Sequence, residues 1–154
     1  TTRDCIEAIE CVSRGKKVTK MLDLGTGTGI LALAGIKLGC KSAVAVDYNY
    51  LAAQTAQNNV VINGLQDSIV MVNGRAEDFT HIPSDLLVAN IHYDVMKDIV
   101  RSEGFYQQKW FILSGLLQNE STKILDYLAT QKVLIIKVVN QEKWCTIMGI
   151  TNPD

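Results

Sequence analysis

A short apolar run that enters a glycine-rich turn constrains this chain more than any other feature. Residues 21–24 read Met-Leu-Asp-Leu, and Gly25, Gly27 and Gly29 follow. An apolar helical segment comes next, and a second apolar run ends in the carboxylate of Asp47. This order predicts a nucleotide-type cofactor site at the first βα turn of a doubly wound sheet. The alternative is a glycine-rich turn without a ligand, and the surrounding pattern favours the site.

The spacing of the glycines distinguishes between cofactors. The dinucleotide fingerprint is G-x-G-x-x-G, and its third glycine would fall at position 30, which is Ile30. Asp23 also stands two places before the first glycine. A carboxylate there suits a positively charged ligand, because a second anion would compete for the amides at the helix N-terminus. S-adenosylmethionine fits, since it carries an amino group, a sulfonium and a ribose but no phosphate, and Asp47 would accept both ribose hydroxyls. A nicotinamide oxidoreductase is the less favoured alternative.

Length and composition bound the class of protein. The chain has 154 residues, 47% of them hydrophobic and 20% charged, which predicts a single globular domain over residues 1–154. A formal net charge of −1 gives no sign of the dense basic face of a nucleic-acid binder. No apolar run approaches the ~20 residues that span a membrane, and no signal peptide opens the chain. We therefore expect a cytoplasmic protein without a membrane partner. Since the chain starts without Met at the approach to a helix, we also expect upstream residues that this sequence does not contain.

The four cysteines predict neither a metal site nor a disulfide framework. Cys5, Cys11, Cys40 and Cys145 form no C-x-x-C pair, and the two histidines do not extend them into a zinc pattern. Their sequence neighbours are apolar, so we expect buried free thiols in a reducing cytoplasm.

The hydrophobic pattern predicts a helix near the N-terminus, repeated strand–helix units and a final strand pair. This order is typical of an α/β, doubly wound Rossmann-like fold with a seven-stranded, mostly parallel sheet and an antiparallel last strand. Predicted strands cover residues 18–24, 41–47, 69–72, 85–91, 110–113, 133–139 and 143–150. Predicted later helices cover residues 30–38, 50–63, 93–100 and 119–130.

Cofactors in such sheets bind outside the carboxyl ends of the strands. The segments to inspect are therefore those that follow the first five strands. They comprise residues 23–29, 47–49, 73–78, 90–93 and 114–115.

Four segments give the chain a specific resemblance. Residues 1–7 look like the end of a G-T-G-x-H-x-T-T signature with the helix after it, and residues 22–38 match a glycine loop and helix. Residues 88–91 read V-A-N-I, and residues 113–116 read L-S-G-L, which is similar to an L-S-G-I motif. The chain thus resembles class I S-adenosylmethionine-dependent methyltransferases. Within that class it is similar to the PrmA family, which modifies amino groups of a ribosomal stalk protein.

The resemblance implies methyl transfer from S-adenosylmethionine to amino groups of a protein substrate, such as a ribosomal protein. It implies cofactor contacts at Thr2, Gly25, Asp47 and Asn90, and the wider class places the adenine near position 76 or 77. With the residues of the glycine loop, the predicted cofactor-binding set contains no metal ligand and comprises Thr2, Asp23, Gly25, Thr26, Gly27, Gly29, Asp47, Tyr48, Ala76, Glu77 and Asn90.

Two departures from the family concern the substrate. The separate N-terminal domain that recruits the ribosomal protein is absent from this sequence. Residues 106–109 read Tyr-Gln-Gln-Lys where the family has a Pro-Gly-Gly turn. A small-molecule or nucleic-acid methyltransferase therefore stays open as an alternative, as does a cofactor-binding module without a substrate domain of its own.

Asn90 is the predicted catalytic residue, with the role of positioning the acceptor amine. It follows a buried strand where the methyl group is expected to point, and its side-chain carbonyl can accept from an amine. Its alternative role is to cap the helix that starts near Tyr93. His92 is either a general base, given an ordinary pKa of about 6.5, or a rim residue over the cofactor. We favour the rim, since proton loss to solvent suffices when alignment limits the rate. Tyr48 and Tyr50 either cover the adenosine or pack beside the second strand.

Overall fold

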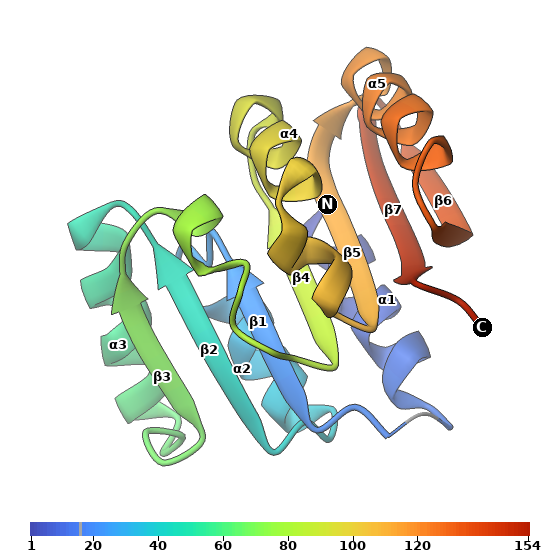
Figure 1. Cartoon of the computed structure of the whole chain (residues 1–154). Helices are drawn as coiled ribbons and strands as arrows, with labels where there is room; N and C mark the ends of the chain where they lie inside the picture. The colour runs from blue at the N-terminus through green and yellow to red at the C-terminus, as the bar shows by residue number, and fades with distance from the viewer. Residues whose placement is uncertain (16) are drawn as a thin grey trace.

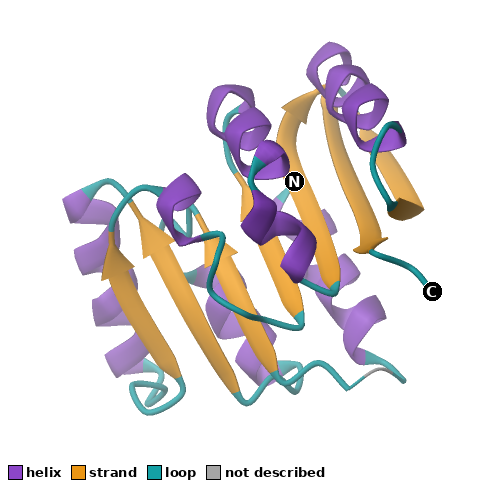
Figure 2. Cartoon of the chain, viewed as in Figure 1, coloured by secondary structure: helices purple, strands orange, loops and turns teal. Residues whose placement is uncertain are grey.

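The computed structural model describes residues 1–15 and 17–154, which form one sheet with helices on both faces (Figure 1, Figure 2). The strands in the described residues are β1 (Lys20–Leu24), β2 (Ser42–Asp47), β3 (Ile69–Asn73), β4 (Leu86–Asn90), β5 (Trp110–Leu117), β6 (Val133–Gln141) and β7 (Trp144–Thr151). The α-helices are α1 (Thr2–Ser13), α2 (Ile30–Lys37), α3 (Tyr50–Ile62), α4 (Tyr93–Arg101) and α5 (Gln118–Ala129), and two short 3₁₀ helices are η1 (Ala76–Phe79) and η2 (Glu103–Gln107).

The sheet has the strand order β3-β2-β1-β4-β5-β7-β6. Neighbours from β3 to β5 pair in parallel, and β7 pairs antiparallel with both β5 and β6. This confirms the predicted fold, including the antiparallel last strand. The strand order reverses beside β1, and ligands of open α/β sheets bind at such a switch point.

The two faces of the sheet bury two separate apolar clusters. Helices α1 and α2 contribute to one cluster and α4 and α5 to the other. Along β4, Leu86 and Val88 join the first cluster, whereas Leu87 and Ala89 join the second. A strand covered on both faces needs apolar residues at every position, which explains the missing polar alternation.

The helix boundaries follow from local chemistry. Asn49 caps α3 by accepting from the backbone N–H of Ala52 at 3.1 Å. Gly64 follows that helix with φ +66°, a left-handed conformation that glycine adopts without steric cost. Helix α2 packs closely on β1, because a Cβ on Gly35 would lie 2.3 Å from Sδ of Met21. In the described part of the chain, no helix is long and apolar enough to cross a membrane.

Two expectations from the sequence were wrong. Strand β5 does not end at residue 113 but continues to Leu117, because a bulge at Gly115, with φ +79°, lets it pair with β7 on both sides. The four cysteines are free, but Cys11 is exposed. Helix α1 buries its face of Cys5, Ile9 and Val12, and Cys11 lies outside that face.

Candidate cofactor-binding site

The glycine loop joins β1 to α2 at the carboxyl edge of the sheet (Figure 1). Gly25, Gly27 and Gly29 have φ values of +74°, +58° and +84°. A Cβ on Gly25 would lie 1.9 Å from Cγ2 of Ile91, so this glycine lets the loop approach the end of β4. A Cβ on Gly29 would lie 3.2 Å from the Cβ of Ala56 in α3. Gly29 therefore allows close packing at the start of α2. In a dinucleotide-binding fold, the third glycine of the fingerprint, which would fall at position 30 here, has this role.

The backbone N–H groups of this loop are largely bonded within the protein. Those of Gly25 and Thr26 donate to the carbonyl of Val46, at 2.8 and 2.9 Å. The N–H of Gly27 donates to Asp47 at 2.8 Å, and that of Gly29 donates to the carbonyl of Thr26 at 2.9 Å. A pyrophosphate needs such N–H groups as donors. The loop is therefore better suited to a cofactor without phosphate.

Asp23 lies beneath the loop and is fully buried. Its Oδ2 accepts from the hydroxyl of Thr26 at 2.5 Å and from the backbone N–H of Ala32 at 3.1 Å. Burial raises the pKa of Asp23 to about 6, although both hydrogen bonds act in the opposite direction. Its Oδ1 accepts from no residue in the described ranges. Asp23 thus ties the loop to the first turn of α2, and it does not line the cleft described next.

Asp47 ends β2 beside the glycine loop, and two backbone groups fix its carboxylate. Oδ2 accepts from the N–H of Gly27 at 2.8 Å, and Oδ1 accepts from the N–H of Asn49 at 2.9 Å. Each carboxylate oxygen can accept a second hydrogen bond. Asp47 can therefore hold two neighbouring hydroxyls, such as those of a ribose.

An open cleft of about 1200 Å³, which includes open solvent, lies at the carboxyl ends of β1 to β4. Its walls come from the segments that follow these four strands, around the point where the strand order reverses. The lining residues are Gly25, Asp47, Tyr48, Asn49, Arg75, Ala76, Glu77, Asn90, Ile91, His92 and Val95.

The structure brings together part of the predicted set. Gly25, Asp47, Tyr48, Ala76, Glu77 and Asn90 line the cleft. Thr26, Gly27, Gly29 and Asp23 support the loop instead, and Thr2 begins α1 outside the lining. Asn49 and Arg75 lie within the segments that the sequence marked for inspection, but neither was singled out. Val95 could not be predicted as a cleft residue, because it lies in the first turn of α4, outside the segments that the sequence marked for inspection.

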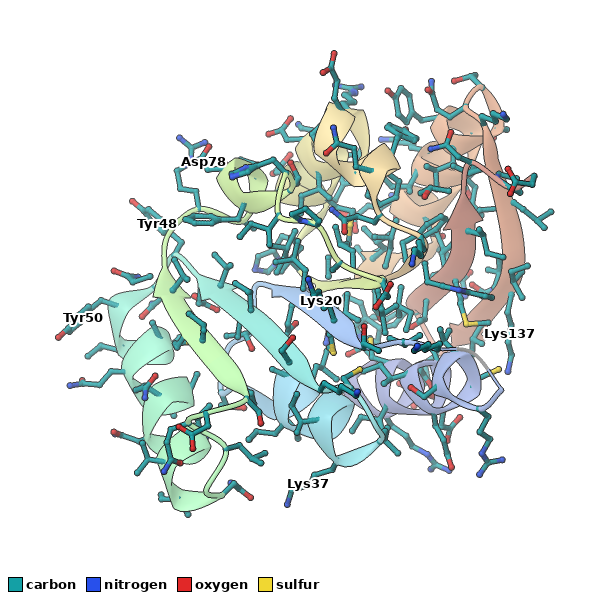
Figure 3. All side chains as sticks on the ribbon, turned by 60° about the horizontal axis from the view of Figure 1, so that its bottom comes forward. Lys20, Lys37, Tyr48, Tyr50, Asp78 and Lys137 are labelled. Atoms are coloured by element: carbon teal, nitrogen blue, oxygen red, sulfur yellow. The ribbon has the colours of Figure 1, made fainter. Side chains whose placement is uncertain are left out.

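The two tyrosines differ in position. Tyr48 is 76% exposed and lines the cleft, whereas Tyr50 is 65% exposed and is not among the lining residues. Figure 3 shows Tyr50 projecting outward from the start of α3. Of the two alternatives for these rings, packing beside the second strand is contradicted, because both side chains are largely exposed.

Arg75 and Glu77 form an ion pair at the mouth of the cleft. The guanidinium of Arg75 donates to Oε1 of Glu77 from Nε at 2.8 Å and also from Nη2. Burial alone would raise the pKa of Glu77, but a backbone hydrogen bond and the Arg75 guanidinium hold it below its ordinary value. Glu77 therefore faces the cleft as a carboxylate with a fixed orientation.

Asn90 ends β4 on the other side of β1 from Asp47. A Cβ on Gly115 would lie 3.0 Å from Oδ1 of Asn90, so this glycine leaves room for the Asn90 side chain. The N-cap of α4 is His92 and not Asn90, which contradicts the alternative role of Asn90 as a helix cap. His92 is exposed and lines the rim of the cleft, as its rim interpretation expects.

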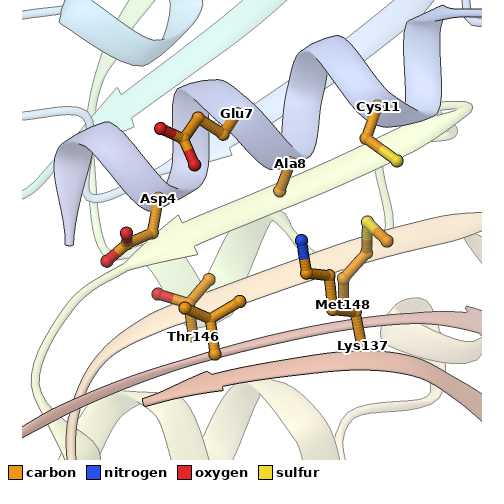
Figure 4. Close-up of a pocket in the computed structure, with 8 residues that line it drawn as sticks. Asp4, Glu7, Ala8, Cys11, Lys137, Thr146 and Met148 are labelled. Carbon is orange, nitrogen blue, oxygen red and sulfur yellow. The ribbon is translucent and has the colours of Figure 1, made fainter. Parts of the chain in front are cut away.

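A narrower cavity of about 350 Å³ lies between α1 and the β6–β7 pair (Figure 4). The side chain of Lys137 points toward α1 there, near Ala8 and Cys11. This cavity shares no lining residue with the cleft, and none of the predicted cofactor residues lines it. In the described residues, no group of acidic, histidine or cysteine side chains could hold a metal ion.

This strand order, with a reversed last strand and a cleft at the glycine loop, defines the fold of class I methyltransferases. The solved delta-N METTL16 MTase domain shares it, with a TM-score of 0.81 at 15% identity over 99% of this chain and 82% of that one. The family model described as Ribosomal protein L11 methyltransferase (PrmA) matches residues 1–152. The chain belongs to this family.

Individual relatives agree with the family match. The Ribosomal protein L11 methyltransferase of Alkaliphilus oremlandii is 30% identical over 97% of this chain and 48% of its own length. That of Pasteurella multocida is 31% identical over 97% of this chain and 50% of its own length. The crystal structure of the ribosomal protein L11 methylase from Lactobacillus delbrueckii subsp. bulgaricus has a TM-score of 0.83 at 27% identity, over 97% of this chain and 77% of that one. The chain spans about half the length of the curated relatives it matches.

Proposed function

We propose that this chain transfers the methyl group of S-adenosylmethionine to an amino group of a protein, and that the natural acceptor is a ribosomal protein. The observation that carries the cofactor is the fixed carboxylate of Asp47 beside a glycine loop whose N–H groups are already bonded. The family to which the chain belongs supports a ribosomal acceptor. The free cysteines support a reducing compartment such as the cytoplasm.

The described residues fit an adenosyl cofactor. The cleft is large enough for it, Asp47 offers acceptors for the ribose hydroxyls, and Ala76 and Glu77 line the region expected for the adenine. The unpartnered Oδ1 of Asp23 beneath the loop adds negative potential that favours a cationic ligand. S-adenosylmethionine, when bound, supplies a methyl group activated by its sulfonium.

The residues of the chain then have to align the acceptor and exclude water. Asn90 Oδ1 can accept an N–H of the incoming amine and so direct the nitrogen lone pair. An amine attacks only in its neutral form, and a lysine in water has a pKa near 10.4. Partial desolvation at the end of β4 favours the neutral form. We assign Asn90 to this positioning and leave the proton to solvent.

Label transfer tests the proposal. The purified chain is incubated with bacterial cell extract and S-adenosylmethionine that is radiolabelled on its methyl group, with Asp47→Asn as the matched variant of weakened cofactor binding. We expect labelled protein with the native chain and far less label with the variant. Label confined to RNA or to small molecules would refute a protein acceptor.

A further inference from the structure

One edge of the molecule carries almost no charge. Residues 48–74, which include α3 and the edge strand β3, contain a single charged side chain, Asp67, whereas 20% of the whole chain is charged. This edge also exposes Tyr50, Val61 and Val70. Figure 3 shows Tyr50 pointing away from the molecule. A solvated helix face normally carries charged residues, so a face without charge that exposes large apolar side chains is typical of an interaction surface.

The outer side of β3 is open. In the described part of the chain, β3 ends the sheet and pairs only with β2. The carbonyl of Ser68 and the N–H of Gly74 both bond to β2, each at 2.9 Å. Backbone groups of successive strand residues point to opposite sides, so those of Met71 and Asn73 point away from β2.

The opposite edge of the sheet is protected, and this edge is not. Strand β6 has a register shift between Ile135 and Lys137, and Lys137 is exposed. Bulges and lysines keep an edge strand from pairing with another chain. Strand β3 has no charged residue, no proline and no register shift. The chain therefore blocks strand pairing at one edge and leaves it open at the other.

Helix α3 presents an uncharged stripe beside this open strand. The stripe consists of four exposed residues, Tyr50, Gln54, Gln57 and Val61. Their spacing of four, three and four residues places them on one face of the helix. Asn59, on the opposite side of α3, donates to the carbonyl of Thr28, just before α2, at 2.8 Å. Because α2 lies on that side, the stripe lies at the outer side of β3, and we call the stripe and β3 together the uncharged edge.

We propose that the uncharged edge binds a second copy of this chain about a two-fold axis that passes Met71. This inference is independent of the proposed function. A two-fold axis brings each residue beside it close to its own copy, so a charged residue there would meet a like charge. A side-chain amide has both a donor and an acceptor and can pair with itself. Gln57 lies in the middle of α3 and Met71 in the middle of β3, so one axis can pass both.

The strand layer and the helix layer fit this axis together. Antiparallel pairing would join the N–H and C=O of Met71 to those of its copy, and the N–H of Asn73 to the C=O of Ile69 in the copy. Helix α3 packs against both β2 and β3. With strands ~4.8 Å apart, the two α3 helices would lie about 10 Å from each other. This matches the ~8–10 Å between packed helices.

The size of the uncharged edge sets the expected affinity. It is smaller than the roughly 20–30 residues that each partner contributes to a stable interface. We therefore expect a weak dimer with a Kd on the order of 10 μM. Sedimentation velocity of the native chain from about 1 to 200 μM brackets this value, because the dimer fraction follows mass action.

Charge-swapped variants test whether the partner is a second copy. Gln57→Lys and Gln57→Glu each place two like charges at the axis and should raise the dimer Kd by at least about tenfold. An equimolar mixture of the two variants brings opposite charges together and should restore a Kd within about twofold of the native value. Asn140→Lys and Asn140→Glu are the matched controls, because they change an exposed amide of the other edge strand, β6. We expect the native Kd in both controls.

Three results would overturn the proposal. The native chain could stay monomeric up to about 200 μM, which would leave the uncharged edge to a different partner. The single Gln57 variants could dimerise as tightly as the native chain, or their mixture could dimerise no better than each variant alone. Dissociation of the dimer by the Asn140 changes, and not by the Gln57 changes, would overturn it in favour of a contact through β6.

Discussion

Replacing Asp47 by asparagine is the most informative single change in the cofactor cleft. Each carboxylate oxygen accepts one backbone N–H, from Gly27 at 2.8 Å and from Asn49 at 2.9 Å. Asn is nearly the same size as Asp, but one of its two groups is an NH₂ donor. That NH₂ would face an N–H donor, and one ribose hydroxyl would lose its acceptor.

The magnitude follows from the bonds that change. A hydrogen bond to a charged group contributes about 1.5–3 kcal/mol. In the variant, one ribose hydroxyl loses its hydrogen bond, and the hydrogen bond to the second hydroxyl loses its charged acceptor. Together these changes should weaken cofactor binding by about 3 kcal/mol, which is on the order of a hundredfold in Kd. The affinity for adenosylhomocysteine should therefore fall by roughly this factor.

Calorimetry with adenosylhomocysteine measures the change directly. Asp67→Asn is the matched control. Asp67 is exposed in the turn before β3, at the amino-terminal end of that strand, whereas the cleft lies at the carboxyl ends of the strands. We expect native affinity in the control, and thermal unfolding of both variants checks that they are folded. The ribose role of Asp47 would be refuted by a folded Asp47→Asn variant whose Kd for adenosylhomocysteine stays within about twofold of the native value. A charged hydrogen bond implies a much larger change in Kd.

Three further changes test other parts of the structure. Gly115→Ala should lower methyl transfer far more than adenosylhomocysteine binding, because its Cβ would press on Oδ1 of Asn90 at 3.0 Å; equal losses in both assays would argue against a role at the acceptor. The pKa of Asp23 is raised to about 6 by burial, so its contribution to stability is full below pH 3.8 and is lost as the pH rises through 6. Asp23→Asn should therefore gain stability relative to the native chain between pH 4 and pH 7, by up to about 3 kcal/mol in thermal unfolding, and a pH-independent difference would contradict this. Gln108→Ala should destabilise the chain by about 3 kcal/mol, because the buried Ser84 hydroxyl and N–H and the backbone carbonyls of Thr80 and Gly104 lose the amide that partners them, yet leave adenosylhomocysteine affinity unchanged once the protein is folded.

The glycine loop and the strand-terminal acid could be predicted from the sequence because their chemistry is local. Glycines at 25, 27 and 29 allow the positive φ values that the turn adopts, and Asp47 ends its strand beside that turn. The alternation of apolar strands and helices also predicted the sheet, since it reflects burial on both faces.

The remaining features depend on contacts between distant segments. Asp23 is buried beneath the loop because of how α2 docks on β1. The sequence around Asp23 does not show whether its side chain is buried there or lines the cleft. The bulge at Gly115 is defined by the pairing of β5 with β7, a distant segment that the local pattern around Gly115 does not reveal. The uncharged edge combines α3 with β3, so only the folded chain places Gln57 beside the open side of the strand at Met71.

The central claim is that the cleft beside the glycine loop holds an adenosyl cofactor without phosphate. Calorimetry of the native chain with S-adenosylmethionine, adenosylhomocysteine and NAD tests it most directly. We predict that both adenosyl compounds bind one-to-one and that NAD does not bind, because the N–H groups of Gly25, Thr26, Gly27 and Gly29 already have acceptors. Binding of NAD without either adenosyl compound would contradict the account.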